Sequence, residues 1–119
     1  MDIGSAVGRQ KGVRAEQIVA LADYLESPQF DACERTVLAY ADAMTTTPTS
    51  VDERLFARLR QHFDEAQIVE LTAAIAWENY RSRFNHALEI ESDHFAEGTA
   101  CALPVRRITP ALPVSERSA

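Results

Sequence analysis

The sequence predicts an all-helical fold, and three observations support this prediction. Apolar residues recur at helical spacing over most of residues 14–90. Short polar motifs typical of helix starts precede several of these segments. The two prolines of this stretch, Pro28 and Pro48, fall between the apolar segments, where they end helices rather than interrupt them. We expect about five helices, ending in a long, buried C-terminal helix.

The helix boundaries follow from the capping motifs and from glycine and proline. We predict helices over residues 1–11, 15–26, 31–46, 50–63 and 64–88. Three motifs have the spacing of a capping box, with Asp31, Ser50 and Asp64 as the capping residues. Gly12 suits the left-handed conformation that commonly follows a helix.

The first four predicted helices differ in the side chains that they direct toward the core. Small residues dominate the first, in which Gly4 and Gly8 share one face. The residues predicted to face the core in the next three are Ile18, Leu21, Ala22 and Leu25, then Val37, Leu38, Ala41 and Met44, then Leu55, Phe56, Leu59 and Phe63. Arg54 and Arg58 have acidic neighbours, so we interpret them as a solvated face.

The last segment has almost no polar face between Leu71 and Trp77. A helix that is apolar nearly all round is usually buried on several sides, so we predict that this is the central helix. On that basis, replacing Trp77 with alanine should cost about 3–5 kcal/mol.

Charge and hydropathy exclude several classes of partner. The net charge of -6 argues against nucleic acid and anionic membrane surfaces, which both need a basic face. No apolar run approaches the roughly 20 residues that span a bilayer, and residues 1–10 do not resemble a signal peptide. We therefore expect a cytoplasmic protein with no membrane partner. Cys33 and Cys101 are far apart, and we expect both thiols to be reduced.

Candidate catalytic and metal-ligating residues are scattered. His62 stands alone, and the nearest group of potential ligands is His86, Glu89, Glu91, Asp93 and His94. No two histidines have helical ligand spacing, so we interpret this group as an acidic helix end. Cys33 lies near a helix start but is flanked by Asp31 and Glu34, which oppose thiolate formation. We assign no catalytic, cofactor-binding or metal residue and expect no cofactor.

A polar run on the last helix has two interpretations. It comprises Glu78, Asn79, Tyr80, Arg83, Asn85 and His86. Polar groups on a buried helix must find hydrogen-bond partners, so we favour a structural network or an interface lock. The alternative is that they form the polar wall of a pocket.

Two segments together resemble the carboxymuconolactone decarboxylase family, which includes the alkylhydroperoxidase D-like proteins. Residues 68–88, with their Ile-Val-Glu-Leu-Thr opening followed by Asn79 and Arg83, are similar to the closing helix of that family. Residues 34–45 are similar to its middle helix, and residues 2–6 to the stretch after its redox motif. The resemblance implies an all-helical fold that forms homo-oligomers. It also implies a family activity of dithiol-dependent hydroperoxide reduction or, in decarboxylase members, of lactone decarboxylation.

The sequence departs from this family at the catalytic residues. By the resemblance, Met1 falls one residue after the second cysteine of the C-x-x-C motif, and Gly4 takes the place of the proton-transferring histidine. We therefore expect residues 1–92 to form an N-terminally truncated helical domain, followed by a flexible tail over residues 93–119. Either a longer form carries the cysteine pair, in which case a thiol reductant is its partner, or the chain is a degenerate member that only assembles or binds a small ligand.

Overall fold

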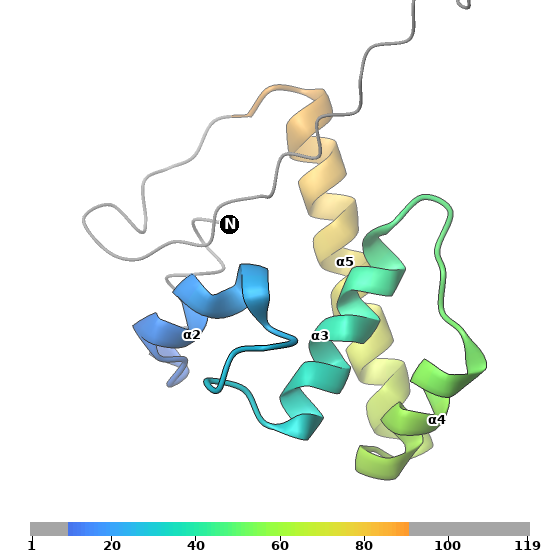
Figure 1. The fold of residues 1–119 in the computed structure, drawn as a ribbon. Coiled ribbons are helices and arrows are strands. Elements are labelled where there is room, and N and C mark those ends of the chain that lie inside the picture. The colour runs from blue at the N-terminus through green and yellow to red at the C-terminus, as the bar shows by residue number, and fades with distance from the viewer. Residues whose placement is uncertain (1–9, 91–119) are drawn as a thin grey trace, which may run out of the picture.

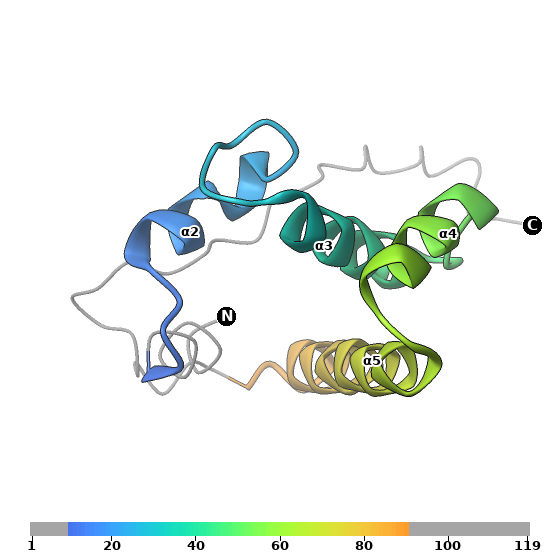
Figure 2. The same cartoon turned by 90° about the horizontal axis from the view of Figure 1, so that it is seen from below.

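The computed structural model describes residues 10–90, and the regular structure of these residues is entirely helical, as the sequence predicts. It consists of α2 (Ala15–Ala20), the 3-10 turn η1 (Leu21–Asp23), α3 (Ala32–Thr45), α4 (Glu53–His62) and α5 (Glu65–Ala87). The view from below shows α2, α3 and α4 in one layer and α5 in a second layer beneath them (Figures 1 and 2). The predicted helix over residues 1–11 falls almost wholly outside the described residues, and so does the predicted tail over residues 93–119.

Two of the predicted capping boxes form as expected. The Asp31 side chain accepts from the amide of Glu34, whose side chain accepts in turn from the amide of Asp31, at 2.8 and 2.9 Å. Asp64 and Gln67 repeat this exchange at the start of α5, also at 2.8 and 2.9 Å. These bonds satisfy amides that a helix start leaves without partners. Gly12 has a positive φ of 96°, as predicted.

The third predicted cap, Ser50, is wrong. The N-cap of α4 is Asp52, whose carboxylate accepts from the amide of Leu55 at 2.8 Å. The Ser50 amide instead donates to the carbonyl oxygen of Ala43 at 3.0 Å, which ties the loop back to α3. Ser50 and Asp52 both have the chemistry of a cap, and the loop contact decides between them.

The helix predicted over residues 15–26 is shorter in the structure. α2 ends at Ala20, and one turn of 3-10 helix follows. The carbonyl oxygen of Asp23 then accepts from the amides of Glu26 and Ser27, at 3.1 and 3.0 Å. This tight turn leaves Leu25 exposed, although the helical pattern placed it inward, and the chain then delivers Phe30 to a buried position.

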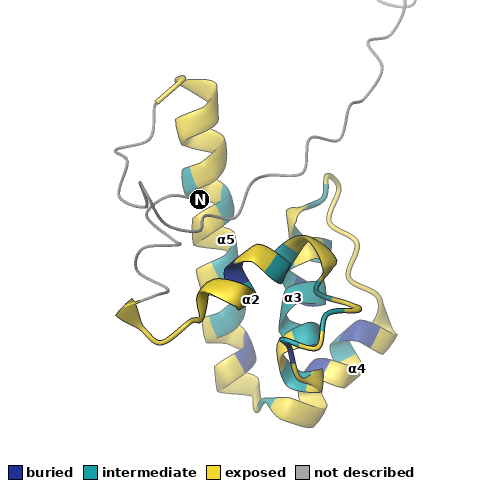
Figure 3. Ribbon diagram, turned by 60° about the vertical axis from the view of Figure 1, so that its left-hand side comes forward, coloured by how far each residue is buried: buried dark blue, intermediate teal, exposed yellow. Residues whose placement is uncertain are grey.

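The core lies where α3, α4 and the first half of α5 meet (Figure 3). Its centre is Leu59, with 0% of its surface exposed, surrounded by Tyr40, Leu55 and Ile68. The prediction for α4 is confirmed, because Leu55 and Leu59 are buried and Phe56 and Phe63 pack against them. Arg54 and Arg58 are exposed, as expected.

The core-facing side of α3 is rotated from the prediction. Its most buried residues are Thr36 and Tyr40, whereas the four predicted core residues are only half-buried, and of these four only Met44 packs against the core. Tyr40 reaches the core because its hydroxyl finds a partner in α5, the Thr72 hydroxyl at 2.7 Å. Thr72 already donates its proton to the carbonyl oxygen of Ile68 at 2.6 Å, so Tyr40 is the donor in this contact. A buried tyrosine needs such a partner, and the bond links α3 to α5.

The predicted burial of α5 is wrong for most of its length. Only Ile68 is buried, and Trp77 is 59% exposed. Within residues 10–90, α3 and α4 cover the side of α5 that carries Ile68, Leu71 and Ile75. An apolar sequence on all sides indicates several buried faces, but here the described helices supply a partner for only one. No helix in the described part of the chain is long and apolar enough to cross a membrane.

The core assignment predicts which substitution is costly. Leu59→Ala should lower the free energy of unfolding by about 2–5 kcal/mol because it leaves a cavity in the centre of the core. Trp77→Ala should cost less than about 1 kcal/mol in the dilute monomer, since the exposed ring loses little packing. Urea denaturation followed by circular dichroism measures both. A larger loss for Trp77→Ala than for Leu59→Ala would contradict this core.

A second prediction concerns Tyr24, whose hydroxyl donates to the Asp42 carboxylate at 3.3 Å. Burial, and then the charge and hydrogen bond of Asp42, raise the pKa of Tyr24 above the ordinary value of 10.0. The fold thus favours the neutral phenol, which stabilises it below the unfolded pKa and ceases to do so as pH rises through the folded pKa. Between about pH 9 and about pH 11, Tyr24→Phe should lose less unfolding free energy than the wild type. Equal losses in the two proteins would exclude the Tyr24 contribution.

Candidate functional site

The outward face of α5 carries a continuous row of apolar side chains, which we call the aromatic stripe. Its residues are Val69, Ala73, Trp77, Tyr80 and Phe84 of α5 and Leu88, which caps the C-terminal end of the helix. They are separated by four, four, three, four and four positions, so they lie along one side of the helix. All six are exposed, and they include Trp77 and Tyr80, each 59% exposed, and Phe84 at 49%.

The three rings of the stripe contact one another. Trp77 and Tyr80 stack with ring centroids 5.5 Å apart and an angle of 15° between their planes. Tyr80 and Phe84 stack at 6.0 Å and 25°. Each distance lies in the range that favours aromatic pairs. The rings therefore form a pre-ordered apolar surface rather than three independent side chains.

Polar residues of the same helix point the other way, toward the end of α3. The Asn79 amide nitrogen Nδ2 donates to the Thr45 hydroxyl at 3.2 Å. The Arg83 guanidinium donates to the Thr45 carbonyl oxygen at 3.4 Å and to the Thr47 hydroxyl at 2.8 Å. Thr45 is the last residue of α3, where carbonyl oxygens lack helical partners and a cation is favoured. We call these three bonds the threonine clamp.

The threonine clamp decides between the two interpretations of the polar run. Asn79 and Arg83 contact threonines of the α3 C-terminal end, which fits a structural network between helices. Glu78 forms a solvent-exposed ion pair with Arg81 at 3.0 Å. Tyr80 belongs to the stripe, and Asn85 and His86 are exposed. Thr45 and Thr47 were not among the candidate residues from the sequence, because no local pattern pairs them with α5.

The residues considered from the sequence as possible catalytic or metal-binding groups do not form a cluster within residues 10–90. Cys33 is a free, half-buried thiol, and it is the sole cysteine of the described residues. His62 is exposed, with its ring edge against Phe63. No three His, Cys, Asp or Glu side chains of this part of the chain could hold a metal ion together. Glu91, Asp93 and His94 lie outside the described residues.

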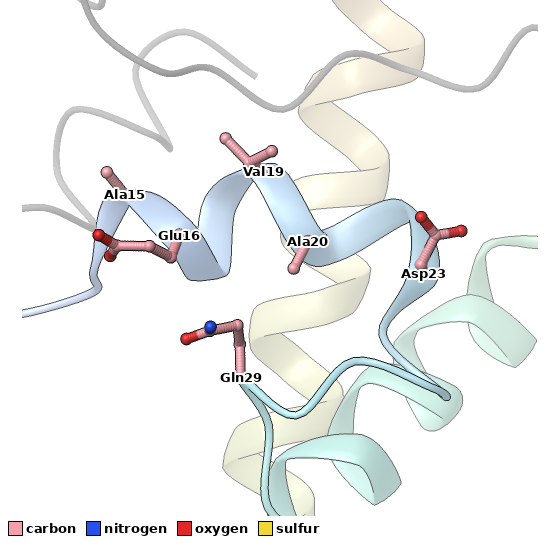
Figure 4. Close-up of a pocket in the computed structure, with 6 residues that line it drawn as sticks. All are labelled: Ala15, Glu16, Val19, Ala20, Asp23 and Gln29. Atoms are coloured by element: carbon pink, nitrogen blue, oxygen red, sulfur yellow. The ribbon is translucent and has the colours of Figure 1, made fainter.

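A shallow depression of about 500 Å³ lies along α2. Ala15, Glu16, Val19, Ala20, Asp23 and Gln29 line it. Glu16 and Asp23 stand at opposite ends of the depression, with Val19 between them (Figure 4). Two separated carboxylates beside small apolar side chains do not form an acid–base pair. The stripe on α5 is therefore the better candidate for a functional surface.

Residues 10–90 thus form a helical fold with an apolar stripe along α5, the longest helix of this part of the chain. The sequence is 38% identical over 107 residues to "Uncharacterized protein YnjA" of Escherichia coli (strain K12). The match covers 90% of this chain and 56% of that protein, so the chain spans little more than half the length of this relative. No protein-family model matches the sequence, and no solved structure matches it. The resemblance to the carboxymuconolactone decarboxylase family stays a prediction.

The threonine clamp predicts a difference between two arginines of α5. Arg83→Met should lower the free energy of unfolding by about 1 kcal/mol because two hydrogen bonds to α3 are lost. Arg81→Met is the matched control, since it removes only an exposed ion pair within one helix and should cost at most about 0.5 kcal/mol. Urea denaturation at neutral pH compares the two. Equal losses would show that the clamp does not contribute to the contact between α3 and α5.

Proposed function

We propose that this chain is a helical domain of the carboxymuconolactone decarboxylase type that acts without a catalytic centre of its own. The observation that supports this proposal is that the two segments that resemble the family, residues 34–45 and residues 68–88, contact each other. Tyr40 of the middle segment contacts Thr72 of the closing segment, and Thr45 contacts Asn79 and Arg83. The resembling segments thus lie on neighbouring helices that contact each other through their own polar residues.

The chemistry of the family activity explains why a non-catalytic role is proposed for this sequence. Reduction of a hydroperoxide by a dithiol needs an attacking thiolate and a second thiol close enough to resolve the product. The two cysteines of the sequence are Cys33 and Cys101. They are far apart in the sequence and do not have the spacing of a C-x-x-C pair. We assign the hydroperoxide-reducing activity, and with it a thiol reductant as partner, only to a form that carries such a pair.

The test is a turnover measurement on the purified protein of residues 1–119. With a small organic hydroperoxide and excess dithiothreitol, the rate of peroxide consumption should equal the rate without protein. A Cys33→Ser variant should behave identically, because no step depends on that thiol. Protein-dependent turnover that Cys33→Ser abolishes would overturn this part of the proposal.

The second candidate function is a non-catalytic assembly module that forms homo-oligomers. The exposed aromatic stripe favours it, because exposed apolar patches of several hundred Å² commonly mark interaction sites. Light scattering measures the mass in solution directly. A monomer at all concentrations would contradict assembly.

A further inference from the structure

We propose that the aromatic stripe of α5 is the contact surface for a second copy of this chain, with the two α5 helices antiparallel. This inference rests on the assembly function and specifies its surface and its geometry. A symmetric dimer buries the same patch on both copies, so the patch must be complementary to itself. The stripe meets this condition in its spacing, in the size of its side chains and in its area.

The spacing of the stripe is the same when it is counted from either end. Steps of four, four, three, four and four residues are symmetric about the point between Trp77 and Tyr80. When two such helices run antiparallel about a two-fold axis at this point, every residue of one stripe meets a residue of the other. Trp77 then lies opposite Tyr80, and Val69 lies opposite Leu88.

Side-chain size and charge fit this register. Ala73 lies opposite Phe84, so a small residue accommodates a large ring, as in helix packing of ridges into grooves. The four charged residues of the same region are Glu70, Glu78, Arg81 and Arg83. In this register they fall opposite Ala87, Asn79, Ala76 and Ala74, so no two like charges are paired.

The area of the stripe suits an interface of two copies. The stripe presents on the order of 600 Å² of surface. This surface comes from three aromatic rings, each about half exposed, and from three smaller apolar residues. Two copies would bury about 1,200 Å² in total, which is the lower end of the range for specific, stable interfaces. Trp77 and Tyr80 would lie at the centre, where aromatic residues contribute most to binding.

Light scattering over a concentration series tests whether the stripe mediates assembly. The wild type should show twice the monomer mass at high concentration. Trp77→Ala should weaken dimerisation by at least about tenfold, while circular dichroism shows the fold retained. Val19→Ala, which shortens an exposed apolar side chain on α2, is the control and should leave the dimer unchanged. A wild-type monomer overturns both the inference and the assembly function, whereas an oligomer that Trp77→Ala leaves intact overturns the inference alone.

Disulfide trapping tests the antiparallel register. Both native cysteines are first replaced by serine, and Ala73→Cys protein is mixed with Phe84→Cys protein under mild oxidation. The two positions are opposite in the proposed dimer, so the mixed disulfide should form faster than the Ala73→Cys homodimer. Ser82→Cys, an exposed position of α5 away from the stripe, should not cross-link to Ala73→Cys. Faster Ala73→Cys homodimer formation would indicate parallel helices, and equal rates for all pairs would indicate random collision; either result overturns the register.

Discussion

The contacts of α3 and α4 with α5 determine which face of α5 points outward. Leu59 of α4 lies at the centre of the core that the three helices form, and the Tyr40–Thr72 hydrogen bond adds a directional link between α3 and α5. Packing around a fully buried residue leaves little freedom for the helices to rotate. The side of α5 that carries Ile68 and Thr72 is therefore fixed toward α3, and the opposite side is fixed outward.

This rotation gives the second half of α5 an unusual distribution of side chains. The face directed at α3 carries Asn79 and Arg83, which bind the threonines of the threonine clamp, while Trp77, Tyr80 and Phe84 face outward. A surface helix normally shows the reverse, with apolar residues toward its own domain and polar residues toward water. Covering the outward face would remove these apolar side chains from water. The stripe therefore supports an assembly function better than a catalytic one.

The sequence predicts those features that depend on neighbouring residues. Asp31 and Asp64 are recognisable as caps because the chemistry of a capping box is complete within four residues. Leu55 and Leu59 are recognisable as core residues because α4 has one clear apolar face. Ser50 fails as a cap because a second acceptor, Asp52, lies two residues further on and the loop contact with α3 engages Ser50 elsewhere.

Features that depend on partners distant in sequence were not predictable in the same way. The burial of Tyr40 and the clamp at Thr45 both depend on residues more than 30 positions away. An apolar pattern on every side of α5 shows that several faces need cover, but not which segment or molecule covers each. The sequence singled out Trp77, Asn79 and Arg83 in the last helix, but it predicted Trp77 to be buried, whereas the structure exposes it.

The fluorescence of Trp77 tests the central claim most directly, since it is the single tryptophan of the chain. Acrylamide quenching and the emission maximum should be followed from dilute to concentrated protein. The account predicts a solvent-accessible tryptophan with red-shifted emission in the dilute monomer, becoming shielded and blue-shifted as the copies associate. A tryptophan that is shielded at every concentration in a monomeric protein would contradict it, because the outward face of α5 would then be buried within its own chain.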